Sequence, residues 1–127
     1  MKHIETGLPR LAQPFSWAVE ANRTIFTAHG PVDADGRIVG GAIEDQARLT
    51  FRNLEQALHA AGAGLRDVAQ VLIYMRRAKD MPAIDGVYRE FFSEPWPNRS
   101  SVGGLDFVHP DMDIEIVVYA ALPTDAS

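Results

Sequence analysis

Cysteine is absent from the 127 residues, which excludes a disulfide framework and a cysteine-based zinc site. No apolar run reaches the roughly 18 residues that a membrane-spanning helix needs, so we expect no contact with a membrane. Residues 1–13 also lack an apolar stretch of signal-peptide length. Together these absences lead us to expect a protein of a reducing compartment, the cytoplasm.

A cluster of basic residues is also missing. The chain has 12 lysines and arginines against 17 aspartates and glutamates, a net charge of −5, and its basic residues are scattered. Nucleic-acid binding normally needs a basic patch or stripe, so we expect no nucleic-acid partner. The length and the 46% hydrophobic content fit one domain, residues 1–127, with a substantial core.

Hydrophobic periodicity predicts an α+β protein with the order β-β-α-β-α-β-β. Strands are expected at 15–21, 24–28, 67–75, from about residue 99, and at 114–121, and helices at 42–61 and 81–94. The first helix has an apolar stripe at spacings of three and four residues: Ile43, Ala47, Phe51, Leu54, Leu58 and Ala61. Residues 1–13 carry little regular signal, and the tail after Pro123 is expected to fray.

Two helices can cover only one face of such a sheet. Segments 68–75 and 114–121 are nevertheless apolar at both alternating sets of positions, apart from Gln70 and Glu115. Something must cover the second face, and the chain has no further element to do so. We therefore expect an obligate oligomer that packs sheet face against sheet face.

Glu115 is a carboxylate in an otherwise apolar strand, and it is costly there unless something pairs with it. Arg99, expected on a neighbouring strand beside Gly103-Gly104, is the natural partner. An arginine and a carboxylate there would form a small anion-binding site, with Arg99 as the anchor and Glu115 holding a water. An ion pair that only satisfies itself is the alternative.

Other candidates are weaker. Ser100 and Ser101 lack a nucleophile motif. His29 is expected to be a packed or capping histidine in a loop that can line a site. Residues 76–80 (RRAKD) are expected to be a solvated connection. Asp106, His109, Asp111 and Asp113 have no recognised metal-ligand spacing, so we expect an acidic loop and no metal.

Several segments, in order along the chain, resemble the RidA (YjgF) family of reactive enamine/imine deaminases, formerly called the endoribonuclease L-PSP family. The most specific is PNRSSV at 97–102, which is similar to the family's P-A-R-S-x-V signature. IEI at 114–116 matches its terminal I-E-I. The other matching segments are QPFSWAV at 13–19, DQAR at 45–48, AAG at 60–62 and VYREFF at 87–92.

The resemblance implies a chorismate-mutase-like fold that forms a homotrimer around a central barrel of sheets, with sites in clefts between subunits. It implies that Arg99 binds the carboxylate of a small 2-imino or 2-enamino acid. Glu115 then helps to place the water that releases ammonia and leaves a 2-keto acid. No metal or cofactor is implied. The chemistry needs mainly orientation and charge stabilisation, because an imine carbon is already electrophilic.

The chain departs from the family at several expected site positions. Phe15 replaces a tyrosine, Asp85 an asparagine, and Ser101 a cysteine or threonine. His29 and Gly30 lie in a loop that differs from the family's S-G-Q-I-P. Gly103-Gly104 replaces a bulkier pair and is expected to enlarge the cleft.

Three activities remain open. The first is deamination of small imino acids, with an aminomuconate-like substrate as a variant suited to a roomier cleft. The second is a non-catalytic trimer that senses a small carboxylate. The third is ribonuclease activity, against which the negative charge argues.

Overall fold

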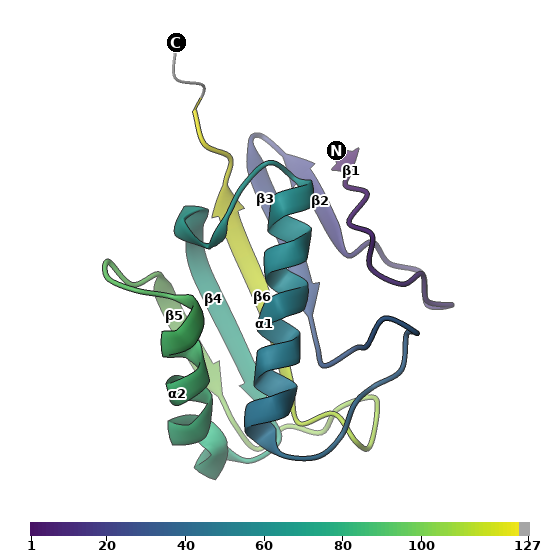
Figure 1. Cartoon of the computed structure of the whole chain (residues 1–127), viewed down its shortest axis with the longest axis vertical. Coiled ribbons are helices and arrows are strands. Elements are labelled where there is room, and N and C mark those ends of the chain that lie inside the picture. Colours follow the sequence, from purple (N-terminus) through teal and green to yellow (C-terminus); the bar gives the residue numbers. More distant parts are fainter. Residues whose placement is uncertain (125–127) are drawn as a thin grey trace.

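The computed structural model describes residues 1–124 as one six-stranded sheet with two helices packed on the same face (Figure 1). The strands are β1 (Lys2–His3), β2 (Ala18–Ala21), β3 (Thr24–His29), β4 (Val68–Met75), β5 (Asn98–Val102) and β6 (Ile114–Ala121). The helices are α1 (Ile43–Ala60) and α2 (Met81–Phe91), and short 3-10 turns cover Leu65–Asp67 and Ala78–Asp80. The predicted α+β class is confirmed. The predicted fraying of the tail falls mostly on residues 125–127, which lie outside the described residues.

The sheet is mixed, and its strand order is β1-β2-β3-β6-β4-β5. Every neighbouring pair is antiparallel except β4 and β5, which run parallel because α2 carries the chain back between them. The predicted element order is correct with one addition, the edge strand β1. The sequence did not predict β1, because its two residues are too few to show an alternating pattern. Neither helix of the described part is long and apolar enough to cross a membrane.

The predicted hairpin of β2 and β3 turns at two residues with positive φ, Asn22 at 51° and Arg23 at 59°. Successive left-handed residues are the signature of the tight turn that matches strand twist. The predicted end of the second helix is too late by three residues. Phe92 is already extended, with φ −117° and ψ 155°, so α2 ends at Phe91.

The core lies between the helices and the covered face of the sheet. Phe51, Leu54 and Leu58 of α1 are fully buried, as the apolar stripe predicts. Phe51 packs against three aromatic rings of the second helical segment, with centroid distances of 5.4 to 6.0 Å. Each such side chain contributes about 1.5–3 kcal/mol by burial. The aromatic residues at helical spacing are therefore core residues.

The two faces of the sheet differ sharply. Ile114, Ile116 and Val118 of β6 are fully buried under the helices, while the alternating residues point the other way and stay partly exposed. We call this second surface the open face. Its side chains include Phe26, Leu72, Tyr74, Glu115, Val117 and Tyr119. The prediction that the helices cover one face is confirmed, and oligomerisation through the open face stays a prediction.

Candidate functional site

The seven residues predicted to form the site fall into two separate groups. Phe15, His29, Gly30 and Glu115 all line one cavity of about 870 Å³ at the end of β3 and the start of β6. Asp85, Arg99 and Ser101 lie together at the contact between α2 and β5. The single chain therefore holds two half-sites, and each must be described by itself.

The first half-site has aromatic walls. Phe15 is 48% exposed and meets Trp17 edge to face, with ring centroids 4.7 Å apart. Trp17 in turn stacks on the imidazole of His29 at 5.7 Å. The remaining lining is largely apolar and includes Leu11, Val32, Ile38, Val108 and Met112. Such a surface suits a ligand with a planar or apolar part.

His29 is 1% exposed, and its hydrogen bonds define its tautomer. Thr27 Oγ1 donates its one hydrogen to the Trp17 carbonyl oxygen at 2.9 Å, so it accepts from His29 Nε2 at 2.6 Å. His29 Nδ1 is then a bare acceptor, and it has no partner in the described part of the chain. Burial lowers the pKa of His29 to about 3, so the ring is neutral at physiological pH.

Glu115 is the carboxylate of this half-site. Burial raises its pKa above the ordinary value of 4.5, because desolvation disfavours the charged form. Within residues 1–124 no hydrogen bond or ion pair reaches its side chain. A carboxyl group of this kind can hold a water and exchange a proton with it.

The second half-site is built around Arg99. The register pairs Arg99 with the fully buried Val71, which turns the arginine toward the helices. Its Nη2 donates to Asp85 Oδ1 at 2.5 Å, and its Nε donates to Ser101 Oγ at 3.2 Å. The guanidinium also lies over the ring of Tyr88, 4.8 Å from the centroid. A cation over an aromatic face gains about 0.5–2 kcal/mol.

The predicted pairing of Arg99 with Glu115 is wrong. Strand β4 lies between β5 and β6, so the two residues are not on neighbouring strands. Glu115 pairs in register with Tyr74 and points to the open face, whereas Arg99 points to the helix-covered face. The error arose because strand order follows from how crossovers pack, and local pattern does not contain that information. The two side chains of one chain therefore lie on opposite faces of the sheet.

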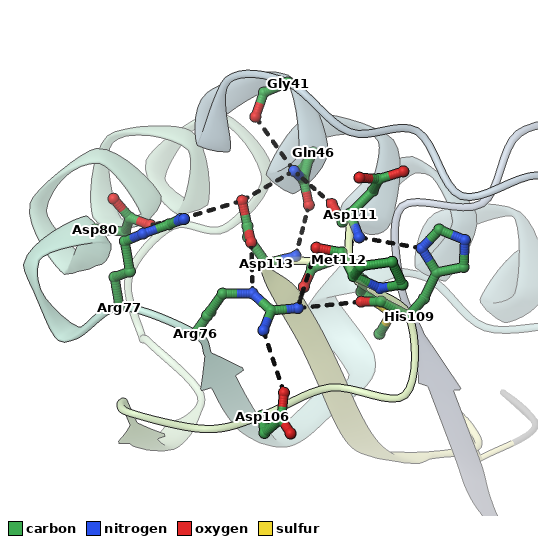
Figure 2. Close-up of polar contacts among 11 residues, drawn as sticks. Gly41, Gln46, Arg76, Arg77, Asp80, Asp106, His109, Asp111, Met112 and Asp113 are labelled. Atoms are coloured by element: carbon green, nitrogen blue, oxygen red, sulfur yellow. Dashed lines mark hydrogen bonds and ion pairs between the residues drawn. The ribbon is translucent and has the colours of Figure 1, made fainter.

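Sequence reasoning also missed a second arginine. Arg76 was expected in a solvated connection, but its side chain is only 22% exposed and holds the loop before β6 (Figure 2). It donates to Asp113 Oδ1 at 2.9 Å and to the carbonyl oxygens of His109 and Met112 at 3.1 and 2.8 Å. The sequence signal for this contact was an arginine directly after one buried strand and an aspartate directly before the next buried strand.

Gln46 completes this cluster and is fully buried. Its side chain accepts from the Asp113 backbone N–H at 2.9 Å and donates to the carbonyl oxygens of Gly41 and Asp111, both at 3.2 Å (Figure 2). Asp106 contacts Arg76 at 3.4 Å, and His109 Nδ1 accepts from the Asp111 N–H. Asp113 therefore holds the loop in place, and no group of three or more potential metal ligands occurs within residues 1–124.

The expected enlargement of the cleft at Gly103 is also wrong. A Cβ built on Gly103 would lie 2.7 Å from Cα of Ala78, so the glycine is needed for close packing. Gly104 has a φ of +76° and faces open space. The missing side chain at Gly103 therefore brings two backbone segments together and leaves no extra room there.

The family model described as Endoribonuclease L-PSP matches residues 7–122. A 2-iminobutanoate/2-iminopropanoate deaminase of Dermatophagoides farinae is 38% identical over 104 residues, which cover 79% of this chain and 80% of the relative. A RutC family protein of Synechocystis is 31% identical over 129 residues, 98% of each chain.

Solved structures share the fold over nearly the whole chain. The structure of E. coli TdcF with bound serine superposes with a TM-score of 0.84 at 29% sequence identity, and covers 95% of this chain and 98% of TdcF. The agreement includes the mixed sheet and both helices.

Proposed function

The chain belongs to the Endoribonuclease L-PSP family, which includes the RidA (YjgF) proteins, and on that premise we propose that it hydrolyses small 2-imino and 2-enamino acids to 2-keto acids and ammonia. Relatives named as deaminases support this reaction class at the level of the family.

We place the active site between subunits. The observation that carries this proposal is that Arg99 and Glu115 point to opposite faces of one sheet, with β4 between them. The open face exposes Phe26, at 39%, and other apolar side chains that a second copy would cover. A ring of three subunits that pack these faces around a central barrel brings Arg99 of one copy toward Glu115 of the next.

The proposed reaction uses the groups that each half-site leaves free. Arg99 Nη1 has no hydrogen bond among the described residues, so it can bind the substrate carboxylate. Glu115 holds a water and takes a proton as the oxygen adds to the imine carbon. The same proton then goes to the nitrogen and gives a carbinolamine. Glu115 next takes the hydroxyl proton and passes it to that nitrogen, so the C=O bond forms as the C–N bond breaks, and ammonia and the 2-keto acid leave. No electron transfer occurs, and no cofactor is needed.

Subunit mixing tests the shared site directly. Arg99→Ala and Glu115→Gln proteins should each be inactive toward 2-iminobutanoate that is generated in the cuvette by a threonine dehydratase. If each site takes Arg99 from one subunit and Glu115 from the next, random mixing of the two variants leaves about a quarter of the sites intact. We expect about a quarter of wild-type activity after subunit exchange.

The controls for this experiment are each variant exchanged with itself, which must stay inactive. If the mixture also stays inactive although mass spectrometry shows mixed oligomers, the two residues do not form a shared site. If the Arg99→Ala protein alone retains full activity, Arg99 is not the carboxylate anchor.

A non-catalytic carboxylate-binding protein is the second candidate, and the serine bound in TdcF favours it. In that case wild-type protein binds small amino or keto acids but does not accelerate imine decay, and Glu115→Gln leaves affinity unchanged. The aminomuconate-like substrate loses its basis, because Gly103 packs against Ala78 and does not widen the cleft. RNA cleavage that persists in Arg99→Ala through every purification step would instead support a ribonuclease.

A further inference from the structure

Arg99 and Asp85 each use only part of their hydrogen-bonding capacity. Asp85 Oδ1 accepts from Arg99 Nη2, while no other described residue donates to Asp85 Oδ2. On the arginine, Nη2 also contacts Met81 Sδ at 3.4 Å and Nε is bonded to Ser101, which leaves Nη1 free among residues 1–124. One acceptor atom and one donor atom of the same ion pair are therefore both free among the described residues.

Both groups are accessible to a small molecule. The side chain of Asp85 is 31% exposed and that of Arg99 is 24% exposed. The pair has no net charge. A second carboxylate bound at Nη1 would share the guanidinium with Asp85, inside the range of about 4–6 Å where like charges repel strongly. A simple anion is therefore a poor ligand for this pair.

We propose that Asp85 is a specificity-determining residue that makes the Arg99 site selective for carboxylates bearing an adjacent N–H group. Arg99 Nη1 binds the carboxylate, and Asp85 accepts a hydrogen bond from the neighbouring nitrogen. The inference rests on the function proposed above, in which Arg99 is the anchor. It adds the chemical feature that the ligand must present beside its carboxylate.

This pairing separates the substrate of the proposed reaction from its product. A 2-imino or 2-enamino acid carries N–H donors next to the carboxylate, and the protonated imine also carries a positive charge. A 2-keto acid has only acceptor atoms at that position, which face the Asp85 carboxylate unfavourably. Sites built to accept a hydrogen bond reject ligands that lack the donor. The product should therefore leave easily.

Stable ligands test this selectivity without any turnover. L-2-aminobutanoate and 2-oxobutanoate have the same carbon chain and carboxylate. The first carries an ammonium group at the carbon where the second carries a carbonyl oxygen. Calorimetric titration of the assembled wild-type protein should show tighter binding of the amino acid. In Asp85→Asn we expect affinity for 2-oxobutanoate to rise about tenfold and affinity for L-2-aminobutanoate to fall about tenfold. Asp85→Glu keeps the charge and should keep the wild-type preference.

Asp80→Asn is the matched control, because it removes the same charge at the start of α2, where the Asp80 carboxylate lies 4.0 Å from Arg77. It should leave the ratio of the two affinities unchanged. An unchanged ratio in Asp85→Asn, with both ligands bound, overturns the inference and leaves the deaminase proposal standing. A shifted ratio in a protein that does not accelerate imine decay supports the inference and overturns the deaminase. Absence of binding of either ligand to wild type overturns both.

Discussion

Arg76 and Arg99 are nearly equal in exposure, at 22% and 24% of their side chains, yet they differ in what they leave free. All three nitrogens of Arg76 donate to protein atoms: to Asp113, to Asp106 and to backbone carbonyl oxygens of one loop (Figure 2). Arg99 keeps Nη1 free among the described residues. Unused donors therefore separate the two arginines, whereas exposure does not.

The largest effect should come from Arg99→Ala. Loss of the carboxylate anchor should lower kcat/KM for 2-iminobutanoate by at least about 100-fold. The free energy of unfolding should fall by no more than about 1–2 kcal/mol, because Asp85 is accessible to water and the contact with Tyr88 is weak. The measurements are the dehydratase-coupled assay and urea unfolding. Arg89→Ala, on the exposed side of α2, is the control and should change neither. A large loss of stability in Arg99→Ala would mean that Arg99 has a structural role like that of Arg76.

Arg76→Ala, by contrast, should affect stability more than activity. Removing its hydrogen bonds to Asp113 and to the loop carbonyls should lower the free energy of unfolding by about 2–3 kcal/mol. Urea unfolding at neutral pH measures this. Arg77→Ala is the paired control, since Arg77 is 50% exposed and lies 3.3 Å from the same aspartate. Equal effects from Arg76 and Arg77 would show that the loop carbonyls contribute nothing.

His29 is a buried group whose Nδ1 acceptor has no partner in the described part of the chain. Its folded pKa of about 3 lies below the ordinary value of 6.5, so the unfolded chain takes up the proton first as the pH falls. Stability should therefore decrease on acidification below about pH 6.5, by roughly 2 kcal/mol between pH 7 and 5. His29→Gln should lack this part of the pH dependence. Parallel stability–pH curves for the two proteins would contradict the lowered pKa of His29.

The smallest effect should come from Asp106→Asn. This carboxylate contacts Arg76 at 3.4 Å, but its side chain is 99% exposed. Exposed ion pairs contribute little because water and salt screen them. The melting temperature should change by less than about 2 °C, which differential scanning fluorimetry can resolve. A larger decrease would mean that the outer contact of Arg76 matters as much as the contacts to the loop backbone.

The elements of the fold could be predicted from the sequence where the pattern is local. The stripe of α1 and the β2–β3 hairpin both depend on residues close together in the chain. The resemblance over 97–102 and 114–116 rests on local motifs as well, and the family match confirms it. Local signals thus identified the residues that carry the proposed chemistry.

The partners of those residues could not be predicted in the same way. Arg99 meets Asp85, 14 positions earlier, because α2 returns the chain and makes β5 parallel to β4. Asp113 meets Arg76 and Gln46 across 37 and 67 positions. Strand order and crossover geometry determine these contacts, and a run of charged letters such as 76–80 looks the same whether it is solvated or buried.

The contact of Gly103 with Ala78 has a consequence for preorganisation. Ala78 lies just before α2, which carries Asp85, and Gly103 lies just after β5, which carries Arg99. Backbone contact at this point fixes the base of the helix against the end of the strand. The relative orientation of the two charged groups is therefore set when the protein folds, so the ligand proposed above would not lose binding free energy in ordering them.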